Sequence, residues 1–160
     1  MFDARRADWF SLAAGAVIWF SGVVATALDF TILQGMVYRF DLVSLAGLVL
    51  GLLGHSIRLQ ARRTLRVYFS GRLRTLPEHQ LIRYGIYKHI RHPAYLGTLV
   101  AYPDVPVFFH SLYGFFVMML IIPLVVLHRI PTEERMLIDR FGDQYRDYMK
   151  SSKKLIPYVY

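Results

Sequence analysis

Three long stretches of the chain carry almost no formal charge, and their lengths predict the fold. Residues 9–28 and 42–57 contain no Asp, Glu, Lys or Arg, and residues 93–127 contain only Asp104. A helix needs about 20 apolar residues to cross the roughly 30 Å hydrocarbon core of a bilayer. The third stretch is long enough for two spans, and the polar, proline-containing segment between Asp104 and Ser111 predicts a turn. We therefore expect four transmembrane helices, the last two forming a tight hairpin, at residues 9–29, 42–58, 93–109 and 111–128.

The segments between and after these spans predict helices at the membrane surface. In the cytoplasmic connector, residues 59–92, arginines interleave with leucine and aromatic residues, which is typical of an amphipathic interfacial helix. Residues 132–150 repeat apolar positions at helical spacing, and Pro131 and Thr132 are suited to the start of a helix. A signal peptide is an alternative for the first span, but the apolar run exceeds the usual ~7–15 residues and further spans follow. The chain is expected to be one all-α integral membrane domain over residues 1–160.

Charge and composition agree with a membrane protein. Apolar residues make up 55% of the chain, above the roughly 45–50% of an average soluble domain. All of the 19 Lys and Arg residues except Arg39 fall on one side of the four-span topology, which places both termini in the cytoplasm. The net charge of +8 is thus expected to reflect topology and contact with anionic membrane lipids, and we predict no nucleic-acid partner. The absence of cysteine excludes disulfides, cysteine-ligated metals and thiol nucleophiles.

Polar residues gather where the connector meets the third span. Residues 79–92 hold three histidines, and histidine is the commonest metal ligand. No HExxH or comparable metal motif is present, so we predict no metal site. The sequence also contains no G-x-S-x-G, G-x-G-x-x-G or G-x-x-x-x-G-K-[ST] motif. These patterns argue against a serine hydrolase and against a Rossmann or phosphate-loop cofactor site.

Arg129 and Glu133 lie near the cytoplasmic end of the fourth span. Being four residues apart, they share one helix face if the helix continues through Pro131. Two interpretations remain open. The residues form an interfacial ion pair, or they form a clamp in which Glu133 holds an ammonium group and Arg129 holds a carboxylate or phosphate.

Five motifs follow one another in the second half of the chain. They are GIY at 85–87, RHPAYLG at 91–97, R-x-x-x-E-E at 129–134, FGDQY at 141–145 and LIPYVY at 155–160. Together they resemble the isoprenylcysteine carboxyl methyltransferase family, which is related to membrane phospholipid methyltransferases. The resemblance covers about residues 69–160. It implies an all-helical membrane enzyme that takes a methyl group from S-adenosylmethionine without a Rossmann fold.

The resemblance also implies the residues of the site. Glu133 would complete the cofactor pocket and Arg129 would face the acidic group of the substrate, so these two are the expected catalytic residues. The rest of the S-adenosylmethionine pocket would be formed by His79, Gln80, Leu81, Ile82, Tyr87, His92, Pro93, Ala94 and Tyr95.

The implied reaction is methyl transfer to a lipid-linked or small lipophilic acceptor, such as the carboxylate of an isoprenylcysteine-like substrate. A carboxylate is ionised at neutral pH and needs no general base, whereas an amine acceptor would need one. The expected location is the inner membrane of a cell or, in a eukaryote, the endoplasmic reticulum.

Two other functions remain open. The pattern R-H-x-x-Y-x-G and the ending IPYVY also resemble NADPH-dependent membrane sterol and C=C reductases, although these place Asn where Ala94 stands. The arginines between Arg58 and Arg74 would suit a non-enzymatic scaffold that binds anionic lipids.

The second expected span carries small residues at a spacing that is typical of closely packed helices. These residues are Gly47, Gly51 and Gly54. They predict close packing against another span, either within the chain or in a homodimer.

Overall fold

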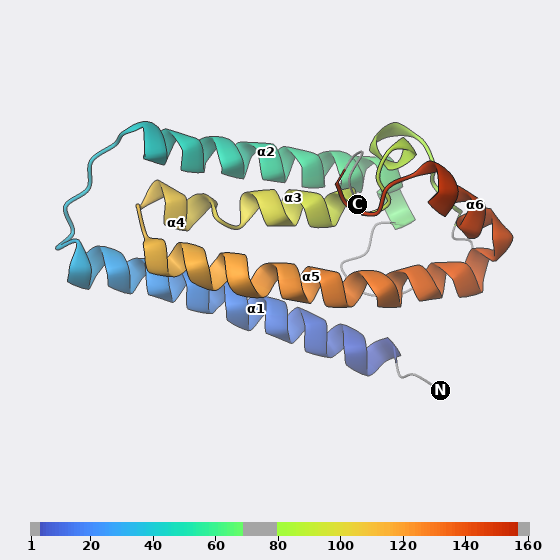
Figure 1. Cartoon of the computed structure of the whole chain (residues 1–160), viewed down its shortest axis with the longest axis horizontal. Helices are drawn as coiled ribbons and strands as arrows, with labels where there is room; N and C mark the ends of the chain where they lie inside the picture. The colour runs from blue at the N-terminus through green and yellow to red at the C-terminus, as the bar shows by residue number, and fades with distance from the viewer. Residues whose placement is uncertain (1–3, 69–79, 157–160) are drawn as a thin grey trace.

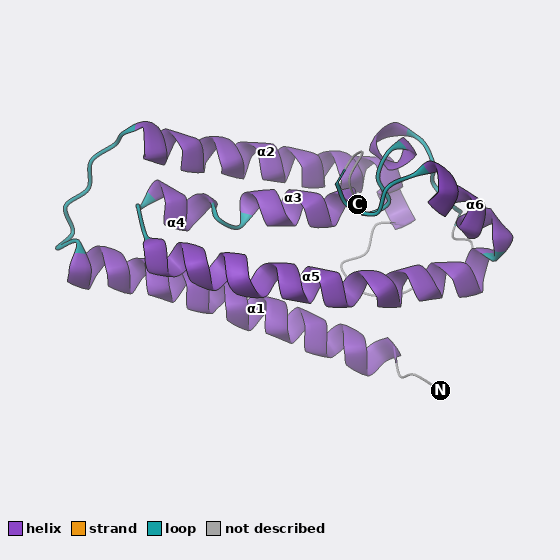
Figure 2. Ribbon diagram, viewed as in Figure 1, coloured by secondary structure: helices purple, strands orange, loops and turns teal. Residues whose placement is uncertain are grey.

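The computed structural model of the chain describes residues 4–68 and 80–156. Regular structure in these residues is helical (Figure 2), and the only β contact among them is an isolated parallel bridge between Ile90 and Lys153. The expected all-α fold is confirmed. In chain order the elements are α1 (Ala4–Leu28), the π-helix η1 (Asp29–Leu33), α2 (Leu42–Leu65), the 3-10 helices η2 (Arg66–Tyr68) and η3 (Gly85–Lys88), α3 (Pro93–Ala101), α4 (Asp104–Phe108), α5 (Leu112–Phe141) and α6 (Asp143–Ser151).

The helices form an elongated bundle in which α3 and α4 are the middle layer (Figure 1). On one side α2 packs on α3 and α4, and on the other side α1 packs on α5. The segment before α3 and the helix α6 lie together at the end of the bundle where α2 and α5 finish. This end therefore brings together the end of α2, the segment before α3 and the region where α5 leads into α6.

Three described helices are long and apolar enough to cross a membrane, namely Ala13–Leu33, Leu42–Leu65 and Leu112–Phe141. The fourth expected span, residues 93–109, consists of the two short helices α3 and α4 rather than one helix. The last backbone bond of α3 runs from Tyr102 N to Thr98 O at 3.0 Å. Because Pro103 has no amide hydrogen, it cannot continue this ladder, and the helix ends there.

The helix α5 is longer than the sequence predicted. A span ending at residue 128 and a separate helix over 132–150 were expected, whereas α5 runs unbroken through Pro131 to Phe141. A proline inside a helix removes one backbone bond, which neighbouring helices in a membrane protein compensate. The helix ends at Gly142, whose φ of 54° favours glycine. The predicted boundary at Pro131 is wrong, and α2 likewise continues past residue 58 to Leu65.

The glycines of α2 allow close packing against the middle layer. A methyl group on Gly54 would lie 2.4 Å from the Ala101 amide nitrogen, and one on Gly47 would lie 2.5 Å from the Phe108 amide nitrogen. Both distances are shorter than any real contact, so only glycine fits at these positions. The small-residue spacing therefore serves packing within the chain, and a homodimer stays a prediction.

The buried apolar core lies between α1, α5 and the C-terminal segment. Positions four residues apart place one face of α5 in this core. Leu155 joins the same cluster and so attaches the C-terminal segment to α5. The buried members are Ile18, Met118, Ile122, Val126, Ile130 and Leu155.

Candidate active site

Two segments far apart in sequence pair through their backbones at the end of the bundle. Arg91 N donates to Lys153 O at 2.8 Å, and His92 N donates to Lys154 O at 3.1 Å. In return, Lys153 N donates to His89 O at 2.9 Å. These bonds hold the chain in place where α3 begins, and they orient Arg91 and His92 towards α5.

Arg91, His92 and Glu134 form a buried charged cluster. Arg91 Nε donates to Glu134 Oε1 at 2.8 Å, and His92 Nε2 lies 3.4 Å from the same oxygen. The side chains of Arg91 and Glu134 are 7% and 9% exposed, so pairing must offset the cost of removing both charges from water. Arg91 also donates to the main-chain oxygens of Met149 and Ser152. The guanidinium therefore connects α5 to the end of α6.

A second polar group lies beside this cluster. Because α5 continues through Pro131, Arg129 and Glu133 share one helix face. Arg129 Nε donates to the Tyr95 hydroxyl at 3.2 Å, and Glu133 Oε2 lies 3.8 Å from His92 Nδ1. The two ring nitrogens of His92 thus face two neighbouring carboxylates. Arg129 is buried, whereas the Glu133 side chain is 36% exposed, which leaves its carboxylate accessible to a ligand.

Three buried tyrosines border the polar groups. The Tyr148 hydroxyl donates to the Tyr87 carbonyl at 2.5 Å, and the rings of Tyr145 and Tyr148 meet edge to face, 5.8 Å apart. Burial raises the pKa of Tyr148 to about 12. Burial, followed by the Glu133 carboxylate, raises the pKa of Tyr87, and burial, followed by the Glu134 carboxylate, raises the pKa of Tyr145. All three phenols are neutral near pH 7, and the Tyr145 hydroxyl is buried with no hydrogen-bond partner among the described residues.

The predicted site residues divide into those that meet here and those that do not. Gln80, Leu81 and Ile82 lie in the irregular segment before η3 and, within the described part of the chain, make none of these side-chain hydrogen bonds or ion pairs. His79 lies outside the described residues. Pro93 and Ala94 form the first turn of α3. The residues that meet in the cluster are Tyr87, His92, Tyr95, Arg129 and Glu133.

The structure adds four residues that the sequence did not indicate as part of the site. Arg91 and Glu134 stand in the motifs that carried the resemblance, but only their neighbours were assigned a role. Tyr145 and Tyr148 belong to the apolar positions that recur at helical spacing over residues 132–150, and they are buried. Nothing in the sequence spacing indicates that these two tyrosines lie near Arg91 and Glu134.

These observations define an all-helical membrane protein with a polar cluster, bordered by tyrosines, at one end of its spans. The profile of the Isoprenylcysteine carboxyl methyltransferase (ICMT) family matches residues 46–139. This is more than half of the chain, and the chain belongs to that family. The resemblance inferred from the motifs is confirmed.

Similar proteins include enzymes with different acceptors in their names. The chain is 40% identical over 73 residues to methanethiol S-methyltransferase 1 of Bradyrhizobium diazoefficiens, covering 46% of this chain and 25% of that protein. It is 36% identical over 86 residues to protein-S-isoprenylcysteine O-methyltransferase of Schizosaccharomyces pombe, covering 51% and 35%. It is 30% identical over 119 residues to a probable protein-S-isoprenylcysteine O-methyltransferase of Oryza sativa subsp. indica, covering 73% and 62%. The chain thus spans less than two thirds of each of these relatives.

A solved structure has the same fold. The eukaryotic intramembrane Ras methyltransferase ICMT superposes with a TM-score of 0.77, covering 90% of this chain and 52% of that one. The sequence identity is 24%. The likeness confirms the integral membrane fold expected from the apolar stretches.

Proposed function

We propose that the protein is an S-adenosylmethionine-dependent membrane methyltransferase that acts on a lipid-linked or small lipophilic carboxylate. The observation that carries this proposal is the convergence of Arg129 and Glu133 on α5 with Tyr95 on α3 and His92 immediately before α3. The family match covers all four residues. Family membership favours methyl transfer over the reductase and scaffold alternatives.

The residues of the cluster fit the proposed cofactor. S-adenosylmethionine carries a zwitterionic amino-acid tail and an aromatic adenosine group, and when bound it supplies a methyl group attached to a positively charged sulfur. The accessible Glu133 carboxylate is suited to an ammonium group, and Tyr87 and Tyr95 offer aromatic surface. The Tyr145 hydroxyl is a buried donor whose missing partner a polar ligand atom would supply.

Arg129 is suited to hold the acceptor. Its guanidinium is buried and fixed by the Tyr95 hydroxyl, so it can bind a carboxylate with little further ordering. Alignment of the acceptor oxygen with the methyl group is the main task of the protein in a displacement of this kind. Because the carboxylate is ionised at neutral pH, no residue has to remove a proton from it.

The position of the cluster suggests how the two reactants arrive. It lies at one end of the spans, which the distribution of Lys and Arg assigns to the cytoplasmic side. A lipid-linked acceptor would approach from the bilayer, and the cofactor would approach from the cytoplasm. The membrane is proposed to be a cell inner membrane or the endoplasmic reticulum.

A thiol is a second candidate acceptor, because one similar protein is named a methanethiol S-methyltransferase. A thiol has a pKa of about 8.5 and must lose its proton before it attacks. A thiol also has no need of the buried Arg129. This side chain is the reason for preferring a carboxylate.

The proposal can be tested by the transfer of labelled methyl groups from S-adenosylmethionine to a prenylated cysteine with a free carboxylate. The same compound as its methyl ester and a long-chain thiol are the comparison acceptors. Arg129→Ala should mainly lower turnover, and Glu133→Ala should mainly weaken cofactor binding. Arg135→Ala, at an exposed position on the same helix, is the control and should retain activity. Equal activity in all variants would remove Arg129 and Glu133 from the site.

A further inference from the structure

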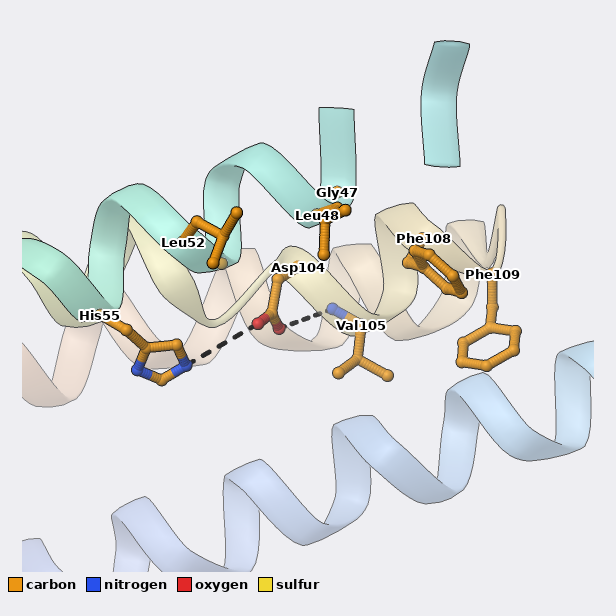
Figure 3. A pocket seen from close by; sticks show the side chains of 9 residues that line it. Gly47, Leu48, Leu52, His55, Asp104, Val105, Phe108 and Phe109 are labelled. Carbon is orange, nitrogen blue, oxygen red and sulfur yellow. Dashed lines mark hydrogen bonds and ion pairs between the residues drawn. The ribbon is translucent and has the colours of Figure 1, made fainter. Parts of the chain in front are cut away.

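A groove between α2 and α4 lies outside the cluster described above (Figure 3). Its cavity volume is about 290 Å³, close to the lower end of the ~300–1,000 Å³ range of small-molecule pockets. Most of its surface is hydrocarbon. The side chains that shape it are Leu48, Leu52, His55, Asp104, Val105 and Phe108.

The groove lies along the charge-free stretch of α2, residues 42–57. Asp104 packs against Gly51 within this stretch, and His55 lies near its end, three residues before Arg58. None of the residues that line the groove belongs to the Arg129 and Glu133 cluster. The groove is therefore separate from that cluster.

The groove contains one polar pair, His55 and Asp104, in an otherwise apolar lining. The Asp104 carboxylate accepts one hydrogen bond, from the Val105 amide to Oδ1 at 2.6 Å. Its second oxygen, Oδ2, lies 3.9 Å from His55 Nε2, which is too far for a direct hydrogen bond. Gly51 leaves room for this carboxylate, since a methyl group there would lie 2.7 Å from Oδ2. His55 and Asp104 thus lie side by side at the groove without a direct hydrogen bond between them.

Ionisable side chains beside an apolar stretch of a membrane helix need polar partners. Polar groups in the hydrocarbon region are costly unless they are paired, and they mark functional sites. The His55 side chain is 68% exposed and that of Asp104 is 25% exposed. Both are therefore accessible to a molecule in the groove.

We propose that this groove binds a long-chain alcohol, with its hydrocarbon chain along Leu48 and Leu52 and its hydroxyl between His55 and Asp104. A hydroxyl is both a donor and an acceptor. In the tautomer of His55 that carries its proton on Nε2, the hydroxyl donates to Asp104 Oδ2 and accepts from Nε2–H across the 3.9 Å gap. In this arrangement an ether satisfies only His55 and an ammonium group satisfies only Asp104.

The binding of this alcohol can be measured without any cofactor. The full-length protein in phosphatidylcholine vesicles is photolabelled with a long-chain primary alcohol that carries a mid-chain diazirine, or with the methyl ether of the same compound. Labelled peptides are then identified by mass spectrometry. We expect the alcohol to label α2 and α4 with an affinity about five-fold above that of the ether, which is the effect of one net hydrogen bond.

Two variants and one control locate the binding. Leu52→Trp fills the groove and should abolish labelling, whereas Leu120→Trp, at an exposed position on α5, should leave it unchanged. Asp104→Leu should reduce the labelling by the alcohol to that by the ether. Equal labelling by both probes in the unmodified protein, or labelling that survives Leu52→Trp, would overturn the proposal. Because methyl transfer is not measured, failure here leaves the proposed methyltransferase activity intact.

Discussion

Two neighbouring glutamates on α5 have different surroundings, and this difference predicts different phenotypes. Glu134 pairs with the buried Arg91, so Glu134→Ala leaves an uncompensated charge in the interior. Removing one partner of a buried pair costs about 3–5 kcal/mol. Glu133 is partly exposed and lies 3.8 Å from His92, so Glu133→Ala should cost less than about 1 kcal/mol. Thermal unfolding in detergent, followed by circular dichroism, measures both changes.

The ligand response provides the complementary measurement. S-adenosylhomocysteine should raise the melting temperature of the unmodified protein, because a ligand that binds only the native state stabilises it. Glu133→Ala should lose this response while it keeps its own stability. If instead Glu133→Ala unfolds as readily as Glu134→Ala, the two glutamates have the same structural role and the distinction is wrong.

The two tyrosines of α6 differ in the hydrogen bonding of their hydroxyl groups, and this difference predicts different effects on stability. The Tyr148 hydroxyl donates to the Tyr87 carbonyl, so Tyr148→Phe leaves a buried acceptor unpaired at a cost of about 1–3 kcal/mol. The Tyr145 hydroxyl has no partner among the described residues. Tyr145→Phe should therefore leave the stability of the ligand-free protein unchanged or slightly higher. Chemical unfolding of the two variants side by side tests the contrast, and a large loss in Tyr145→Phe would contradict it.

At the level of elements, apolar periodicity predicted which segments are helical but not where each helix ends. Proline alone does not decide this. Pro103 ends α3, whereas Pro131 lies within α5. Neighbouring packing can compensate for one lost backbone hydrogen bond, and the sequence of a single helix does not contain that information. The end of α5 follows a local signal, because Gly142 adopts a positive φ.

The close contact between α2 and α3 predicts that a larger residue at Gly54 destabilises the protein. At Gly54 an added methyl group would meet the backbone of α3, so Gly54→Ala must force the two helices apart. Overpacking of this kind costs about 1–3 kcal/mol. Gly15→Ala is the matched control, because open space surrounds Gly15 and alanine favours a helix by about 1 kcal/mol over glycine. A lower melting temperature for Gly54→Ala only is the expected result, and equal stability would show that α2 and α3 are not tightly packed.

At the level of the whole molecule, the cluster depends on a pairing that the sequence does not reveal. The motifs contained His92, Arg129 and Glu133, so the resemblance could assign them to one site. The backbone hydrogen bond between Arg91 and Lys153 joins residues 62 positions apart. No periodic pattern in the sequence indicates this bond. Contacts of this kind arise from tertiary packing, and only the structure shows that Arg91 reaches Glu134.

The arrangement of the molecule across the membrane yields a prediction that the chain is well suited to test. The loop between η1 and α2 lies at the opposite end of the bundle from the segment before α3 (Figure 1). The bias of Lys and Arg predicts a cytoplasmic position for the second of these. Because the chain contains no cysteine, single substitutions at exposed positions can be labelled without background. In intact bacterial cells, a membrane-impermeant maleimide should label Val37→Cys but reach Lys88→Cys only after the membrane is opened. The reverse pattern would place the Arg129 and Glu133 cluster outside the cell, away from cytoplasmic S-adenosylmethionine, and labelling of both sites in intact cells would show a mixed orientation.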